Sequence, residues 1–174
     1  MLPLTADDVQ IALDTLNLGV KIHFFETTTA TSQQAADGIG CELGKIVKSI
    51  CFLVDAQPVI VLTSGDQKVD DRKLAELYNV GRKKVKAANA EQLVEIWGYE
   101  PGSVPPFGHR RKIPTYIDST LRRFDQLYAA GGAHNAIFPI TLDQLVAATG
   151  GTIAFVVKPP ESGVSRIIPE PPPI

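Results

Sequence analysis

The chain has 174 residues, 44% of them hydrophobic and 21% charged, which is enough apolar material to bury a core within one domain. Its 17 basic and 19 acidic residues give a net charge of −2, which alone indicates no polyanionic partner. The first ten residues lack the pattern of a signal peptide, and no apolar run is long enough to span a bilayer. Cys41 and Cys51 are too few for a disulfide framework, so we expect reduced thiols and a cytoplasmic location.

The N-terminal part of the sequence shows two helix signals with a short strand between them. Thr5 is a capping residue followed by two aspartates, which the helix dipole favours, and apolar residues then recur at helical spacing. Residues 22–25 predict a short strand, and Thr31 or Ser32 is expected to cap the next helix.

The strongest strand signal follows. Residues 45–55 and 58–64 are rich in β-branched side chains and are separated by a tight connection, which predicts a β-hairpin. Two helices are expected after the hairpin, one containing Leu74 and Leu77 and a short one at residues 91–97.

Residues 98–109 are rich in glycine and proline, which excludes regular structure, while their aromatic side chains argue against a floppy linker. Strands are then expected at residues 115–118, 126–130, 136–140 and 152–157, with a helix opened by Thr141 or Asp143 before the last of them.

These elements intermix without a regular βαβ alternation. We therefore expect an α+β fold, with a curved, mixed, partly barrel-like β-sheet flanked by helices. Residues 1–158 would form a single domain, and residues 159–174 would form an extended, proline-rich tail.

Lys48 is the first candidate functional residue. Side chains alternate along a strand, so Lys48 shares a face with Ile46 and Ile50 and places an ammonium group on an apolar surface. The lysine stem can carry this charge out to water, or the charge can line a pocket for an anionic ligand or a developing oxyanion. The spacing leaves both interpretations open.

A stiff turn between Gly102 and Pro106 is the second candidate. Pro105 and Pro106 restrict the backbone and offer no N–H group, so the amides of the three preceding residues are the available donors. Such a turn can hold a carbonyl group or an oxyanion, although it can also be a rigid surface turn.

Other chemistries receive less support. Ser103, His109 and Asp118 are the residue types of a hydrolytic triad, but no nucleophile-elbow sequence surrounds the serine. The histidines and cysteines lack metal-ligand spacing, so we expect no metal ion and no other cofactor. Basic residues would attract a phosphate backbone if they converged on one cleft. They occur in three runs, at residues 82–86, 110–112 and 122–123.

In this order the segments resemble the YbaK family of aminoacyl-tRNA deacylases, which are related to the editing domain inserted in bacterial prolyl-tRNA synthetases. The similarity extends from about Thr31 to Val157. It rests on an ordered set of short motifs at residues 33–36, 46–50, 58–62, 69–74, 98–109, 116–118 and 130–132.

The resemblance implies roles for individual residues. Lys48 corresponds to the family's pocket lysine near the aminoacyl ester, and Gly102 and Pro106 fit its GxxxP loop, so these three are the expected catalytic residues. Asp118 matches a frequently acidic position to which we assign no catalytic role. Substrate contacts are implied for Ser103, Val104, Phe107, Gly108, His109, Gly131 and Gly132.

The sequence departs from the family pattern in two places. Pro101 and Pro105 make the loop stiffer than common family versions, and residues 133–135 replace a stretch that is often basic and contains glycine. Both departures affect the expected amino-acid specificity more than the expected reaction.

The resemblance further implies that the chain hydrolyses the ester bond of mischarged aminoacyl-tRNA, with a small amino acid on tRNA(Pro) or a similar tRNA. Its partners would be the tRNA 3′ end and could include an aminoacyl-tRNA synthetase, with no membrane. Two alternatives remain open: a non-catalytic module that binds tRNA ends or a synthetase, and a serine hydrolase that uses Ser103 and His109.

Overall fold

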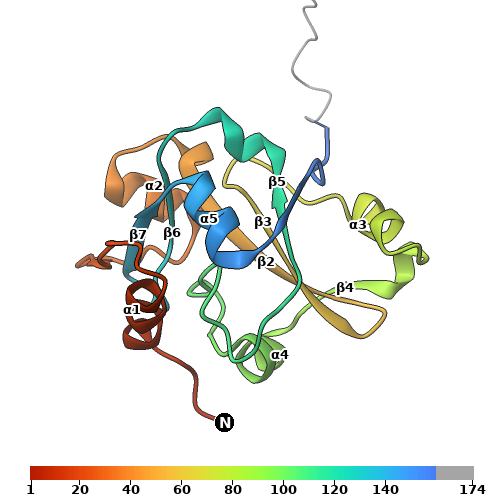
Figure 1. The fold of residues 1–174 in the computed structure, drawn as a ribbon, viewed down its shortest axis with the longest axis horizontal. Coiled ribbons are helices and arrows are strands. Elements are labelled where there is room, and N and C mark those ends of the chain that lie inside the picture. The colour runs from red at the N-terminus through yellow and green to blue at the C-terminus, as the bar shows by residue number, and fades with distance from the viewer. Residues whose placement is uncertain (160–174) are drawn as a thin grey trace, which may run out of the picture.

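The structure, a computed structural model, describes residues 1–159 (Figure 1). The expected proline-rich tail lies outside the described residues apart from Pro159.

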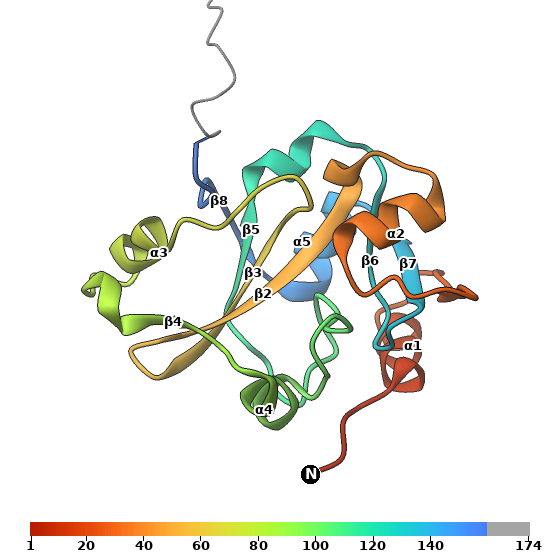
Figure 2. The same ribbon diagram turned by 180° about the vertical axis from the view of Figure 1, so that it is seen from behind.

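One mixed β-sheet runs through the whole described chain. It has eight strands, seven of them in the order β1-β7-β6-β2-β3-β5-β8, with β4 paired to β2. The strands are β1 (His23–Phe24), β2 (Ile46–Val54), β3 (Gln57–Ser64), β4 (Val85–Ala87), β5 (Thr115–Asp118), β6 (Leu127–Ala130), β7 (Ala136–Ile140) and β8 (Thr152–Ala154). The sheet curls without closing, because β1 and β8 end the strand order and do not pair with each other (Figure 2). The expected α+β fold with a curved mixed sheet is therefore confirmed.

The β2–β3 hairpin is the longest pairing in the sheet. Its two-residue turn consists of Asp55 and Ala56, both with positive φ (48° and 64°). This combination is the type I′ turn, whose twist matches the twist of the paired strands. The predicted hairpin is confirmed, with Gln57 already in β3.

Helices cover both faces of the sheet. They are α1 (Ala6–Thr15), α2 (Ser32–Ile39), α3 (Asp71–Leu77), α4 (Ala90–Gln92), which runs into a π-helical turn at Leu93–Trp97, and α5 (Leu142–Thr149). Short 3₁₀ turns occur at Leu43–Lys45, Arg82–Lys84 and Ser119–Arg123. For two helices the sequence left two candidate capping residues each, and the structure identifies the cap as Thr31 for α2 and Thr141 for α5. Their hydroxyl groups accept hydrogen bonds from the amides of Gln34 and Gln144.

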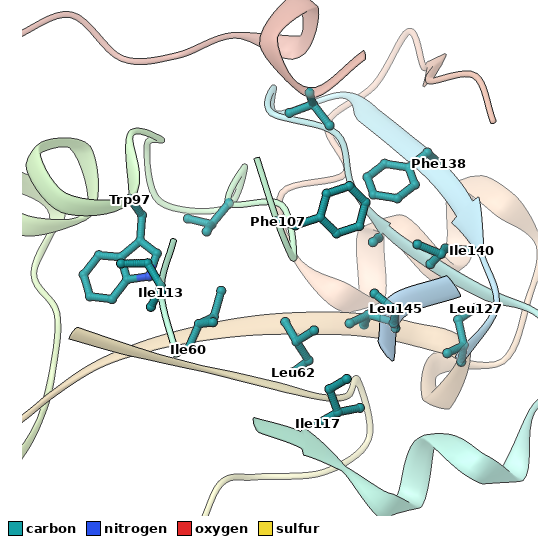
Figure 3. Close-up of a cluster of buried hydrophobic side chains, with 14 of the residues drawn as sticks. Ile60, Leu62, Trp97, Phe107, Ile113, Ile117, Leu127, Phe138, Ile140 and Leu145 are labelled. Atoms are coloured by element: carbon teal, nitrogen blue, oxygen red, sulfur yellow. The ribbon is translucent and has the colours of Figure 1, made fainter. Parts of the chain in front are cut away.

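The main core lies on the face of the sheet that α1 and α5 cover. Alternate residues of β2 and β3, such as Val47 and Leu62, meet Leu13 of α1 and Leu145 of α5 there. Aromatic residues fill the space between the sheet and the 97–113 segment (Figure 3). The opposite face is covered by α2 and α3 in two smaller clusters.

Two expectations differ from the structure at the margins. β8 ends at Ala154, and Val157 instead forms an isolated bridge with Val69. β4 falls in the basic run and was not expected; it pairs with the far end of β2. Within residues 1–159 no helix is long and apolar enough to cross a membrane.

Candidate active site

A cleft opens where the sheet is interrupted beside β2. Along one of its two edges, β2 pairs with β3 over nearly its whole length. On the other edge, β6 pairs only with Ile46 and Val47, and β4 pairs only with residues 52–54. Residues 48–51 therefore have no strand partner on this edge among the described residues. A cleft of about 330 Å³ lies here, between residues 46–50, residues 29–35 and residues 101–104.

Lys48 provides the charge in this cleft. Among the lining residues within 1–159 it is the only charged side chain, and most of the others are apolar. Its neighbours on the same face, Ile46 and Ile50, pack into hydrophobic clusters, as the strand alternation predicted. The ammonium group donates to the carbonyl oxygen of Gln67, which leaves two of its three N–H bonds for a ligand or water.

Burial is the main influence on the ionisation of Lys48. It lowers the pKa of the ammonium group, because the charged form loses water contacts, and the positive charge of Lys68 acts in the same direction. The carboxylate of Asp66 opposes both effects and favours the protonated form.

The Gly102 loop forms the opposite wall of the cleft. Gly102 has φ +82°, and a Cβ atom placed on it would lie 3.0 Å from the Cβ of Ala30 and 3.1 Å from its carbonyl oxygen. Glycine is therefore required both for the backbone conformation and for the close approach to Ala30. Gly102 and Val104 both line the cleft, and their amides have no hydrogen-bond acceptor within residues 1–159.

Hydrogen bonds of Ser103 hold this loop in place. Its amide and its hydroxyl both donate to the Glu100 carbonyl oxygen, at 3.1 and 2.9 Å, and its own carbonyl accepts from the Gly132 amide at 3.1 Å. Ser103 is 3% exposed and does not line the cleft. The loop is thus tied to the turn that follows β6.

The second half of the loop, from Pro106 to His109, does not face the Lys48 cleft. Pro106, Phe107, Gly108 and His109 line a separate depression and not the Lys48 cleft. Nε2 of His109 donates to the Pro105 carbonyl oxygen at 2.7 Å, and burial lowers the pKa of this histidine to about 4, so it is neutral near pH 7.

These residues hold the loop in shape. Tyr99 donates its hydroxyl to the Gly108 carbonyl oxygen at 2.7 Å, and the Phe107 ring packs against Phe138. The Gly131 and Gly132 turn likewise packs away from the cleft, since a Cβ on Gly132 would lie 2.7 Å from Val9 of α1. Of the sequence candidates, the structure brings Lys48, Gly102 and Val104 together at one cleft. The catalytic roles of Lys48, Gly102 and Pro106 and the substrate contacts of the other candidates stay predictions.

The geometry does not assemble a serine triad. The Ser103 hydroxyl and the His109 ring donate to backbone carbonyls, as described above. Asp118 is buried, and its carboxylate accepts from the amides of Thr120 and Val156, which gives it a structural role at the end of β5. No group of potential metal ligands occurs in the described part of the chain.

The three basic runs do not converge on the cleft. Lys48, which belongs to none of them, is the only basic residue that lines it in the described part of the chain. Several members instead contact neighbouring structure: Arg82 pairs with Asp71, Lys84 with Asp55, and Arg123 with Asp66. The Arg123–Asp66 pair places a carboxylate near enough to Lys48 to influence its charge. No local sequence signal indicates this pair, because the two residues are 57 positions apart.

The chain is a small α+β domain whose curled sheet places a lysine in a cleft opposite a glycine loop. Residues 26–148 match the family described as aminoacyl-tRNA editing domains, and the chain belongs to this family. The expected family resemblance is thereby confirmed.

Two sequence relatives and one solved structure illustrate the relationship. The chain is 33% identical over 122 residues to the Bacillus subtilis protein YwhH, covering 70% of this chain and 76% of that one. It is 38% identical over 92 residues to the proline–tRNA ligase of Lactobacillus gasseri, covering 53% of this chain but only 16% of the ligase. A crystal structure of a candidate trans-editing enzyme for prolyl-tRNA synthetase superposes with a TM-score of 0.83 at 33% identity, covering 91% of this chain and all of that one.

Proposed function

We propose that this chain is an aminoacyl-tRNA deacylase that acts in trans, hydrolysing the ester between a wrongly attached small amino acid and the 3′ end of tRNA(Pro) or a similar tRNA. Membership of the editing-domain family and the similarity to the candidate trans-editing enzyme support this proposal. In this proposal the tRNA 3′ end is the substrate, and a synthetase is the source of the error.

The observation that carries the proposal is the pairing of Lys48 with the Gly102 loop across one cleft. Attack on an ester places negative charge on the carbonyl oxygen, and fixed N–H donors stabilise this charge more than they stabilise the substrate. The amides of Gly102 and Val104 are available for this purpose, and the Lys48 ammonium adds a positive charge.

The attacking group would be water or a hydroxyl group of the substrate. No carboxylate or histidine lines the cleft within residues 1–159, so we propose that the substrate assists in accepting the proton. The remaining lining is mostly apolar and combines short side chains such as Ala30 and Ala35 with larger ones such as Ile50. We propose that a small aminoacyl group occupies this space. Such a second site corrects errors that a synthetase cannot avoid, because one methylene changes binding by only about 1–3 kcal/mol.

The test is deacylation of a panel of small aminoacyl-tRNAs, including Ala-, Ser- and Cys-tRNA(Pro). We expect turnover of at least one member, reduced about 100-fold or more by Lys48→Ala, the range seen when one charge-stabilising donor is removed. Lys21→Ala is the control, since this lysine is exposed and pairs with Asp14 on the surface. Binding of tRNA without turnover of any member would instead identify a binding module.

A further inference from the structure

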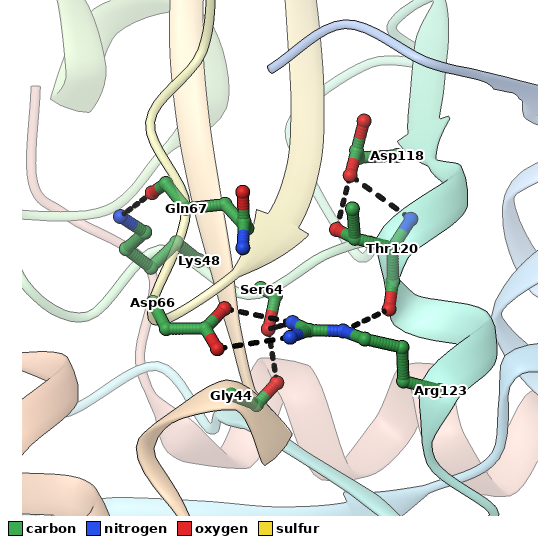
Figure 4. Close-up of polar contacts among 8 residues, drawn as sticks. All are labelled: Gly44, Lys48, Ser64, Asp66, Gln67, Asp118, Thr120 and Arg123. Atoms are coloured by element: carbon green, nitrogen blue, oxygen red, sulfur yellow. Dashed lines mark hydrogen bonds and ion pairs between the residues drawn. The ribbon is translucent and has the colours of Figure 1, made fainter. Parts of the chain in front are cut away.

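The loop that follows β3 holds the Lys48 ammonium group. Its residue Gln67 supplies the carbonyl oxygen to which Lys48 donates (Figure 4). The Gln67 amide donates back to the Ser64 carbonyl at 3.0 Å. The position of the ammonium group therefore depends on where residues 65–68 lie.

Arg123 fixes this loop from the other side. Its two terminal nitrogens form a fork on the Asp66 carboxylate, at 2.7 and 3.0 Å, and one of them also donates to the Ser64 hydroxyl at 2.8 Å. The Arg123 Nε donates to the Thr120 carbonyl at 2.8 Å, which anchors the guanidinium to the 3₁₀ turn after β5. A two-pronged pair of this kind fixes orientation as well as distance.

Glycines allow the close packing around the pair. A Cβ on Gly44 would lie 2.9 Å from the Asp66 carboxylate, and a Cβ on Gly65 would lie 2.4 Å from the Leu43 carbonyl oxygen. The Ser64 hydroxyl donates to the Gly44 carbonyl. The loop is thus packed against the segment that leads into β2, the strand that carries Lys48.

The pair itself adds little to stability. The side chains of Arg123 and Asp66 are 40% and 35% exposed, and ion pairs at such exposure contribute about 0–1 kcal/mol. Losing the pair should therefore leave the fold intact while freeing the loop that holds Lys48.

We propose that Asp66 and Arg123 are positioning residues, which hold the 65–68 loop so that its Gln67 carbonyl aims the Lys48 ammonium into the cleft. The proposal rests on the deacylase function proposed above. Asp66 has a second effect, because its negative charge favours the ammonium form of Lys48. Lys68 of the same loop is the other charged residue of the described chain that acts on Lys48, and the described residues that line the cleft contribute no further charge.

The first experiment is an NMR titration of the Lys48 side chain in the wild-type protein and in Asp66→Asn. Removing the carboxylate removes an effect that raises the Lys48 pKa, so this pKa should fall below the wild-type value. In a deacylation assay, the activity that depends on the ammonium group should then disappear at a lower pH on the alkaline side. An unchanged titration would overturn the electrostatic part of the proposal whether or not the protein deacylates tRNA.

The second experiment compares Arg123→Gln with Arg122→Gln. Both remove one positive charge from the same turn, but no hydrogen bond or ion pair of the Arg122 side chain exists within residues 1–159. We expect Arg123→Gln to lower kcat about 10- to 100-fold, as a displaced catalytic group does, with KM changed less and thermal unfolding nearly unchanged. Arg123→Lys should recover only part of the loss, because lysine cannot form the two-pronged contact. Arg122→Gln should keep wild-type activity.

A double variant separates positioning from a general structural effect. If Asp66 and Arg123 act through Lys48, then Arg123→Gln should reduce activity no further in a Lys48→Ala background. Equal losses in both backgrounds would overturn the proposal. A wild-type protein without deacylase activity would refute the proposed function instead, while the NMR titration would still report on the contact.

Discussion

At the scale of single residues, the cleft depends on a glycine in its wall. Gly102 combines a positive φ with close contact to Ala30, and both conditions disfavour a Cβ atom. The nearby amides that we propose as oxyanion donors are held in place by this contact, so the backbone here is as much a part of the site as the lysine.

We predict that Gly102→Ala destabilises the protein by about 1–2 kcal/mol, the cost of a left-handed residue. We expect the deacylation rate to fall by more than this loss of stability explains. The larger activity loss follows because relief of the contact with Ala30 moves the amides by a few tenths of an ångström or more. Urea unfolding and the deacylation rate would be measured beside Gly81→Ala, where φ is −68° and the space is open. Equal activity of the two variants would contradict a role for the loop backbone.

Residues at the cleft could be singled out from the sequence where the signal was local. Lys48 on an apolar strand face and Gly102 before a stiff proline turn stood out from their immediate neighbours, and both line the cleft, while their catalytic roles stay predictions. Pro106 and His109 were grouped with them because they share a loop with Gly102. The second half of this loop, however, lines a depression separate from the Lys48 cleft. Sequence proximity could not reveal that separation.

At the scale of elements, strand pairing creates the site. β2 is long enough to take two different partners on one edge, β6 at its start and β4 at its end, and the cleft opens between them. The expected ranges of β5 and β7 match the structure, because their β-branched runs are bounded by turn residues. β4 was missed, since three residues in a basic run form a strand only through their distant pairing with β2.

The turn between β2 and β3 offers a test of whether its backbone conformation lowers the stability of the protein. Ala56 has φ 64°, a conformation that costs an alanine about 1–2 kcal/mol and a glycine almost nothing. We predict that Ala56→Gly raises the free energy of unfolding by about 0.5–1 kcal/mol, less than the full relief because glycine also gains entropy in the unfolded chain. Activity should not change, because the turn lies at the end of the hairpin away from α2 and the cleft (Figure 2).

Ala87→Gly serves as the comparison, since this exposed residue of β4 has a negative φ and should lose stability on the same substitution. Chemical denaturation of both variants would decide the matter. Destabilisation by both would mean that the turn is not strained.

At the scale of the whole molecule, the site is supported by a helix outside the region that matches the editing-domain family. α1 precedes residues 26–148, yet its Val9 meets Gly132 and its Ala12 lies 3.2 Å from the position of a Cβ on Gly108. It therefore braces both turns that hold the Gly102 loop. The sequence predicted this helix from its own periodicity but not the surface it covers, because that contact joins segments about a hundred residues apart.

If α1 is part of the core, then deleting one of its buried side chains must destabilise the entire domain. Leu13 is 0% exposed within the main cluster, so Leu13→Ala should lower the free energy of unfolding by about 2–5 kcal/mol through lost burial and a new cavity. Ile11 on the same helix is 63% exposed, and Ile11→Ala should change stability by less than about 0.5 kcal/mol. Urea unfolding followed by tryptophan fluorescence reports on the core directly, because Trp97 lies in the same cluster. A single shifted transition for Leu13→Ala would show that α1 unfolds with the sheet, whereas an unshifted transition would mean that α1 is an appendage and that the Gly102 loop is held without it.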